Sequence, residues 1–207
     1  TNNNALIGLG LSGNSDILSF SAVNATAIIQ TGVITVTPSI NGCEGASVNF
    51  EITVNPSSTV DDPGAISECD GAPTADIFFT GSDPLIIYNW TNTNTDIGLP
   101  VAGTGDILSF VATNLTNDPI QATIEVTPEL NGCDGTAQTF TIDVNPSPEM
   151  DIPSDQTICV TNNSVPVIFS SNVLGTSYSW TNDNSNIGLG INGSGDIPSF
   201  TTINTGN

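Results

Sequence analysis

Acidic side chains and cysteines are the residues best suited to chemistry in this sequence, which has 207 residues and no Lys, Arg or His. A Ser or Cys nucleophile needs an activating base, most often His, so nucleophilic hydrolysis is excluded. Two carboxylates in one site could cleave glycosides, but Asp16, Asp106 and Asp196 recur at a fixed interval of 90 residues. We therefore expect each of these aspartates to bond backbone N–H groups in its own turn, and we expect no enzyme activity.

Neighbouring acids near residue 60 are the best candidates for binding a metal ion. Asp61 and Asp62 precede a Pro-Gly turn, and Asp151 follows Asp61 by 90 positions. Carboxylate oxygens suit Ca²⁺, which takes about six to eight oxygen ligands, so these three residues form a weak calcium candidate. Ile152 stands where a second Asp62 would be needed. Solvated acids are therefore the favoured interpretation, and no cofactor is expected.

The four cysteines fall into two classes. Cys43 and Cys133 lie in Asn-Gly-Cys turns, whereas Cys69 and Cys159 lie well before them in the repeating pattern. Without His and without CxxC spacing a zinc site is not expected, and one cysteine of each class per repeat predicts disulfides in an oxidising compartment. The expected pair is Cys69 with Cys133. A bond between neighbouring repeats stays open, because a ten-residue strand of about 33 Å would separate the two turns, and bonded Cα atoms lie about 4–7 Å apart.

The charge of the chain limits its partners. Asp and Glu number 21, the net charge is -21, and 10% of residues are charged. Phosphate recognition relies on Lys and Arg, so nucleic acid is excluded, and an anionic membrane surface is disfavoured by the same sign of charge. No apolar run reaches the roughly 18 residues of a membrane span. The 37% of hydrophobic residues nevertheless argues against disorder.

A tandem repeat is the strongest pattern in the sequence. Residues 91–110 and 181–200 are identical at 12 of 20 positions, and residues 1–20 align at the same spacing. Trp90 and Trp180 are also 90 positions apart. An unbroken period predicts a constant module geometry, as stacked repeats require.

Val-Asn-Pro sequences mark the ends of the repeats, because Pro cannot donate to a strand ladder. They predict a partial β-sandwich repeat at residues 1–56, a complete one at 57–146 and a partial one at 147–207. The chain opens with Thr1 and has no signal peptide, so we expect it to be cut from a longer array.

Alternating apolar and polar residues predict short β-strands. Asn41-Gly42 and Asn131-Gly132 suit the positive φ angles of hairpin turns, so the last two strands of a repeat should pair. Roughly seven strands per repeat favour an immunoglobulin-like sandwich with Trp in its core. The expected strands include residues 34–36, 50–54, 77–79, 88–90, 107–110, 124–126, 140–144, 167–169 and 178–180.

Four ordered motifs carry a family resemblance: W-T-N-x-N-x-x-I-G-L, G-x-G-D-I-x-S-F, T-P-x-x-N-G-C and F-x-I-x-V-N-P. Together they resemble the PKD-like, immunoglobulin-like repeats of very large Bacteroidetes surface proteins, such as SprB-type gliding adhesins and other type IX secretion substrates. The resemblance covers essentially the whole chain. It implies a secreted or cell-surface protein that acts in adhesion or gliding through arrays of sandwich modules, without catalytic residues.

The preferred function is thus a structural or adhesive stalk, and its partners would be other repeats of the chain or neighbouring filament subunits. The alternative is a glycan- or protein-binding module appended to a secreted protein, using residues 111–121, which differ from residues 21–31. A domain attached to a longer secreted hydrolase is a third reading. Mutual completion of the two partial repeats between chains is disfavoured, because residues 181–207 repeat the content of residues 1–26.

Overall fold

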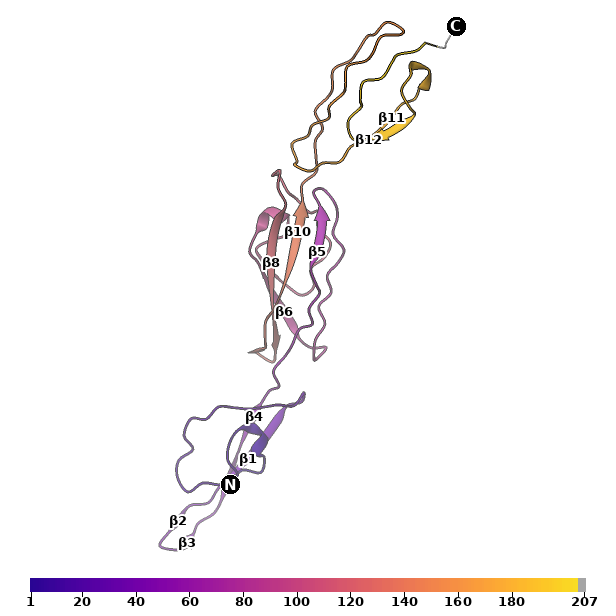
Figure 1. Cartoon of the computed structure of the whole chain (residues 1–207). Helices are drawn as coiled ribbons and strands as arrows, with labels where there is room; N and C mark the ends of the chain where they lie inside the picture. The colour runs from indigo at the N-terminus through magenta and orange to yellow at the C-terminus, as the bar shows by residue number, and fades with distance from the viewer. Residues whose placement is uncertain (205–207) are drawn as a thin grey trace.

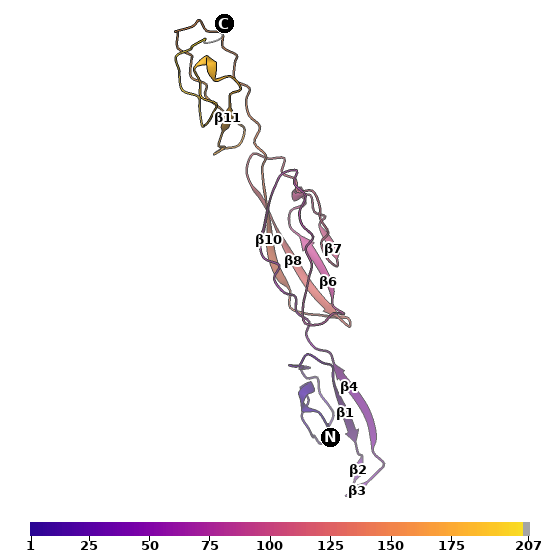
Figure 2. The same cartoon turned by 90° about the vertical axis from the view of Figure 1, so that its right-hand side faces the viewer.

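A computed structural model describes residues 1–204 as three bodies in line (Figure 1). The N-terminal end of the chain lies in one outer body, and the described part of the chain ends in the other, in both views (Figure 2). Strands, bridges and extended segments dominate, and the only helical elements among these residues are three short 3-10 turns. The expected all-β class is confirmed. Within the described residues, no helix is long and apolar enough to cross a membrane.

The middle body is built on one six-stranded sheet. Its strand order is β5-β10-β8-β6-β7, with β9 paired to β8. The β8–β10 pair is antiparallel, whereas β5 joins the other edge of β10 in parallel. The strands are β5 (Ile66–Cys69), β6 (Ile87–Asn92), β7 (Ala102–Thr104), β8 (Ile120–Leu130), β9 (Cys133–Asp134) and β10 (Gln138–Asn145).

Extended segments held by single bridges face this sheet. Ile77 bridges Ile107, and Val60 bridges Gly81. The strands expected at residues 77–79 and 107–110 are therefore not continuous ladders. Side-chain oxygens explain the difference, because they accept hydrogen bonds from the backbone N–H groups that a ladder would use. The acceptors are Asp106 for Phe79, Asp76 for Ser109 and Thr74 for Phe110.

The hydrophobic core lies between these two layers. Ile124 and Val126 from β8 and Ile142 from β10 face this core, and each is at most 1% exposed. They belong to one cluster with Trp90 and Ile107. Full burial of each aliphatic side chain contributes about 1.5–3 kcal/mol to folding. The body is consistent with an immunoglobulin-like sandwich, and Trp90 lies in its core as expected.

The first body contains a strand pair with the register of β8 and β10. Strands β1 (Gln30–Val36) and β4 (Val48–Val54) pair antiparallel and set Ile34 opposite Phe50. In the middle body, Ile124 lies opposite Phe140. Two short strands, β2 (Ser39–Ile40) and β3 (Cys43–Glu44), extend beyond the pair.

The third body has β11 (Ser179–Thr181) paired with β12 (Asn192–Ser194). Each body also holds one 3-10 turn, which the hydrophobic pattern did not predict. In the middle body Asn94 caps the turn through its side chain, and Gly98 ends it with a φ of 93°. The turns are η1 (Ala5–Ile7), η2 (Thr95–Ile97) and η3 (Ser185–Ile187).

The Asn-Gly turns lie where the sequence predicts them. Asn131 and Gly132 have φ angles of 53° and 76° and connect β8 to β9. Asn41 and Gly42, with φ angles of 48° and 81°, connect β2 to β3. Successive positive φ angles are typical of a two-residue type I′ hairpin turn.

Candidate functional site

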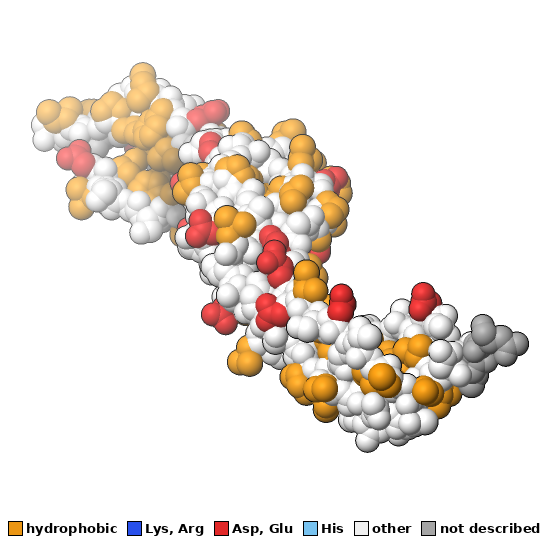
Figure 3. All heavy atoms as spheres, turned by 90° about the horizontal axis from the view of Figure 1, so that it is seen from above, with side chains coloured by type: hydrophobic (Ala, Val, Ile, Leu, Met, Phe, Trp, Pro, Cys, Tyr) orange, Lys and Arg blue, Asp and Glu red, His pale blue; other side chains and the backbone are white. Residues whose placement is uncertain are grey.

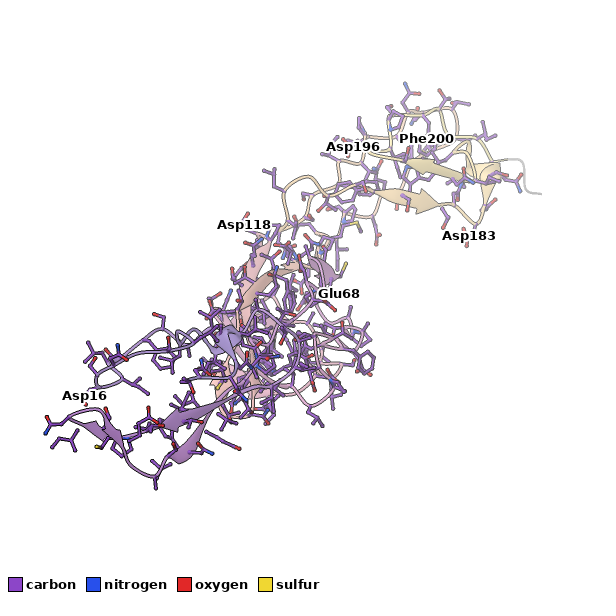
Figure 4. All side chains as sticks on the ribbon, turned by 90° about the horizontal axis from the view of Figure 1, so that it is seen from below. Asp16, Glu68, Asp118, Asp183, Asp196 and Phe200 are labelled. Carbon is purple, nitrogen blue, oxygen red and sulfur yellow. The ribbon has the colours of Figure 1, made fainter. Side chains whose placement is uncertain are left out.

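Two of the three recurring aspartates, Asp106 and Asp196, bond backbone, but not in their own turns as the sequence suggested. The N–H of Phe79 donates to Oδ1 of Asp106 at 2.8 Å, across 27 residues of sequence. The N–H of Phe169 donates to Asp196 in the same way at 2.9 Å. Each carboxylate thus joins two extended segments. Asp16 and Asp196 lie at opposite ends of the molecule (Figure 4), so these acids do not share a site.

The three calcium candidates are all exposed, and each makes a separate hydrogen bond. Asp61 accepts a hydrogen bond from the Thr80 hydroxyl at 2.8 Å. Asp62 accepts one from the N–H of Gly64 at 2.9 Å, which closes a local turn. Asp151, in the third body, accepts the Ser170 hydroxyl as Asp61 accepts Thr80. Across residues 1–204, no three His, Cys, Asp or Glu side chains gather closely enough to hold a metal ion.

The strand register does not fit the expected Cys69–Cys133 disulfide. Cys69 pairs with Asn145 at the end of β10. Cys133 pairs with Leu130, and a short turn then leads to the start of β10 at Gln138. The eight residues of β10 span about 26 Å, far more than a disulfide allows. All four cysteines are free and exposed.

Cys133 and Cys69 lie close to the two junctions between bodies. Asn55 follows β4 of the first body, and its Nδ2 donates to Sγ of Cys133 in the middle body at 3.6 Å. Asn145 is the residue 90 positions after Asn55, and it is the strand partner of Cys69. Cys133 and Cys69 therefore each neighbour an asparagine that follows a Val at the end of a strand, and these two asparagines are 90 positions apart, at the two different junctions. The sequence left this inter-repeat arrangement open as an alternative.

Buried asparagines hold the loops, a role that sequence reasoning missed. Asn92 is 5% exposed, and its Nδ2 donates to the Leu99 carbonyl at 2.8 Å. Asn114 donates to the carbonyls of Asp118 and Val144, across 30 residues in the second case. The recurrence of these asparagines at 90-residue spacing is the feature of the sequence that could have indicated this role. Their counterparts include Asn2, Asn182 and Asn24.

The loop proposed for ligand binding is largely occupied with its own structure. Oδ1 of Asn114 accepts hydrogen bonds from the N–H and the hydroxyl of Thr116. Asn24 and Thr26 make the same two bonds in the first body. Leu115 lies between these anchors and is 97% exposed. The turn at Asn114 and Thr116 is therefore the same as the turn in the first body, and Leu115 is an exposed apolar side chain within it.

An open face on the third body forms a hollow lined by aliphatic, aromatic and uncharged polar residues. It encloses about 670 Å³. Its lining contains no acidic residue, although the chain carries 21 of them. Orange hydrophobic side chains are visible at the surface of both outer bodies (Figure 3). The aliphatic and aromatic lining residues are Ile158, Val160, Val167, Ile187, Leu189, Ile197, Phe200 and Ile203.

Comparison with protein families gives a likeness over the first part of the chain. No curated protein matches the chain. PKD-like domains are typically extracellular β-sandwich modules, which agrees with the all-β fold described here. The match to that family model covers residues 2–58, the first body and its junction, and is described as a PKD-like domain.

Proposed function

We propose that this chain is a piece of a structural, adhesive stalk in a large extracellular or cell-surface repeat protein, built from tandem 90-residue sandwich modules. The modules would correspond to residues 1–56, 57–146 and 147–207. Recurrence of the same long-range hydrogen bonds carries this proposal. Asp106 with Phe79 and Asp196 with Phe169 form one such pair of bonds, 90 positions apart. Equal contacts at equal spacing are what copies of one module produce.

The junctions support a stalk because they are short and partly buried. Pro56 is buried, and Ser58, at 1% exposure, donates its hydroxyl to the Pro128 carbonyl at 3.0 Å. Two residues past the Val-Asn-Pro stop, the chain is thus already packed against the next body. Such a junction limits bending between neighbouring bodies. A stalk that holds its far end away from a surface needs this stiffness.

The setting of this stalk follows from the family resemblance. A role in adhesion or gliding, export by the type IX route and contact with neighbouring filament subunits are all part of the proposal. Glycan or protein binding is the weaker alternative, since the side chains of Asn114 and Thr116 in the proposed binding loop bond their own turn. Leu115 is the residue left to contact a ligand.

Small-angle X-ray scattering tests the stalk. A compact globule of 207 residues has a radius of gyration of about 17 Å. Strand β8 spans 11 residues, or about 36 Å, so three such bodies in line have a radius of gyration of about 30 Å. We expect the larger value from monomeric chain in reducing buffer. A value near that of the globule would refute the proposal.

A further inference from the structure

The layer that faces the sheet of the middle body has one open edge, at residues 75–78. On the other edge of this segment, Ile77 and Ile107 exchange backbone hydrogen bonds of 2.8 and 3.1 Å. The backbone N–H and C=O groups of Ala75 and Phe78 make no hydrogen bond within residues 1–204. Both residues are exposed, although the bodies on either side of the middle one are present. Extended backbone with unpaired N–H and C=O groups can pair with another strand.

A groove of about 300 Å³ lies between this edge and strand β5. Strand β5 is the outer strand of the six-stranded sheet (Figure 1). Ile66 and Glu68 line the groove from β5, because side chains two positions apart point to the same face of a strand. Ala75, Asp76 and Phe78 line it from the open edge. Phe78 is 65% exposed, so an apolar wall adjoins unpaired backbone groups.

The third body shows how an amide fills the equivalent edge. Gln156 is the residue 90 positions after Ile66, and Val165 corresponds to Ala75. Nε2 of Gln156 donates to the Val165 carbonyl at 3.0 Å, and the Val165 N–H donates to Oε1 of Gln156 at 2.9 Å. The Gln156 amide thus donates and accepts one hydrogen bond each, as one residue of an added strand does. The aliphatic side chain of Ile66 has no such groups, so the middle body leaves this backbone position open.

A carboxylate without a partner lies in the groove. Glu68 is half-buried, and its side chain makes no hydrogen bond to the described part of the chain. Asp76 also lines the groove, and its Oδ1 accepts from the Ser109 N–H at 2.7 Å. A nearby cation stabilises a carboxylate that has lost part of its water. Because this chain has no Lys, Arg or His, a second copy of it cannot supply the cation.

We propose that the open edge at residues 75–78 binds an extended segment of another protein that carries Lys or Arg. The backbone of this segment pairs with Ala75 and Phe78, and one of its cationic side chains pairs with Glu68. In this mode of recognition, backbone hydrogen bonds give affinity and side-chain contacts give specificity. The inference goes beyond the stalk proposal and does not depend on it, because every residue of the groove lies within the middle body.

The first test measures peptide binding to the full chain by fluorescence polarisation. The probe is a labelled peptide of about six residues, a usual strand length, with alternating Val and Lys and with both ends blocked. One control peptide has Glu in place of Lys, and a second keeps Lys but has methylated backbone nitrogens. We expect the probe to bind at least about tenfold more tightly than either control. No binding of the probe, or equal binding of the methylated peptide, would overturn the proposal.

Amide hydrogen exchange followed by NMR locates the bound peptide. The Ala75 and Phe78 N–H groups should exchange more slowly when the probe is bound, because they then donate hydrogen bonds. The Val165 N–H is the internal control, since it already donates to Gln156, and its exchange should not change. Protection confined to other parts of the chain would contradict pairing at this edge.

Ile66→Gln should close the edge, because the third body has Gln at this position and uses it to bond the equivalent backbone. We expect the probe to bind this variant at least about tenfold more weakly. Leu85→Gln is the matched control, because Leu85 is 76% exposed and does not line the groove. Circular dichroism checks that both variants fold. Binding of the probe to folded Ile66→Gln at the parent level would refute the proposal.

Glu68→Gln separates binding from protection of the edge. Inward-pointing charges also keep edge strands from pairing with other chains. If Glu68 pairs with the cation of the probe, its replacement should weaken binding about tenfold, as the loss of one charge-assisted hydrogen bond does. Unchanged or tighter binding to Glu68→Gln would mean that the carboxylate does not recognise the partner, and it would overturn the proposal.

Discussion

Gly103 lies flat against the indole ring of Trp90. A Cβ atom added at Gly103 would come within 2.2 Å of Cζ2 of Trp90, and the two residues are partners in the β6–β7 pair. Gly193 and Trp180 repeat the arrangement, again at 2.2 Å. The first glycine of each Gly-x-Gly motif is therefore required by close packing. The second, Gly105, has a φ of 78° and serves the turn.

Gly103→Ala should destabilise the middle body by about 1–3 kcal/mol, because the new methyl group has to displace the Trp90 ring or the β7 backbone. Denaturant unfolding followed by Trp fluorescence measures this, in a Trp180→Phe background so that Trp90 alone reports. Gly13→Ala is the control, since Gly13 has nothing within 4 Å of an added Cβ. Equal stability of the Gly103 and Gly13 variants would contradict the packing argument.

Asp106→Ala should also destabilise the middle body, by about 1–3 kcal/mol, because it leaves the Phe79 N–H without its acceptor. Asp106→Asn should cost less, since the amide keeps an oxygen at the same position. The same fluorescence titration measures both. Asp16→Ala is the matched control, because among residues 1–204 the Asp16 carboxylate accepts no hydrogen bond. A larger loss for Asn than for Ala would count against a hydrogen-bonding role.

The sequence predicted the regular strands of the sheet well. It predicted poorly the extended segments that face the sheet, whose backbone N–H groups donate to side chains. Phe140 to Val144 and Tyr88 to Trp90 alternate apolar and polar residues, and both lie in strands of the sheet. Residues 77–79 alternate less clearly. Their strand pairing is interrupted by the Asp106 carboxylate, which lies 27 residues away from Phe79. A local hydrophobic pattern shows which side chains of a strand face the core. It does not show that a side chain distant in sequence accepts a hydrogen bond from the backbone of that strand.

Prediction of the candidate sites failed for a related reason, because the sequence does not show which residues lie close together in the fold. Cys69 and Cys133 looked like a pair because each repeat holds one of each, but β10 separates them. The contact between Asn55 and Cys133 crosses 78 residues and a module boundary, which no local spacing encodes. Register and direction of a strand decide which ends meet, and composition does not carry that information.

Tyr88 should ionise only at strongly alkaline pH. Burial raises its pKa above 10.0, and the nearby carboxylates of Asp61 and Asp106 raise it further. Because the folded pKa exceeds the unfolded value of about 10, the contribution of Tyr88 to stability is full below pH about 10 and is lost as pH rises through the folded pKa. The pH of half-ionisation, followed by phenolate absorbance in a Tyr178→Phe background, should lie above 10.

Asp61→Asn should lower that midpoint, because it removes the carboxylate that raises the pKa of Tyr88 more than Asp106 does, while keeping an oxygen for the Thr80 hydroxyl. Asp16→Asn, in another body, is the control and should leave the midpoint unchanged. A Tyr88 midpoint at or below 10 in the folded protein, or an equal response to both substitutions, would refute this account of the Tyr88 environment.

Asn92 and Asn182 differ in burial but have two equivalent hydrogen bonds, so together they test the effect of burial. Both donate Nδ2 to a Leu carbonyl, at 2.8 Å and 3.0 Å, and both accept from the N–H two residues later. Asn92 is buried and Asn182 is half-buried. Asn92→Ala should cost about 1–3 kcal/mol, since the abandoned groups have no access to water. Asn182→Ala should cost less, because Asn182 is half-buried and water can replace its bonds. Trp90 and Trp180 fluorescence report the two bodies separately when the other Trp is replaced by Phe. If the two losses were equal, the difference in burial between Asn92 and Asn182 would have no effect on stability, and this account of the two asparagines would be wrong.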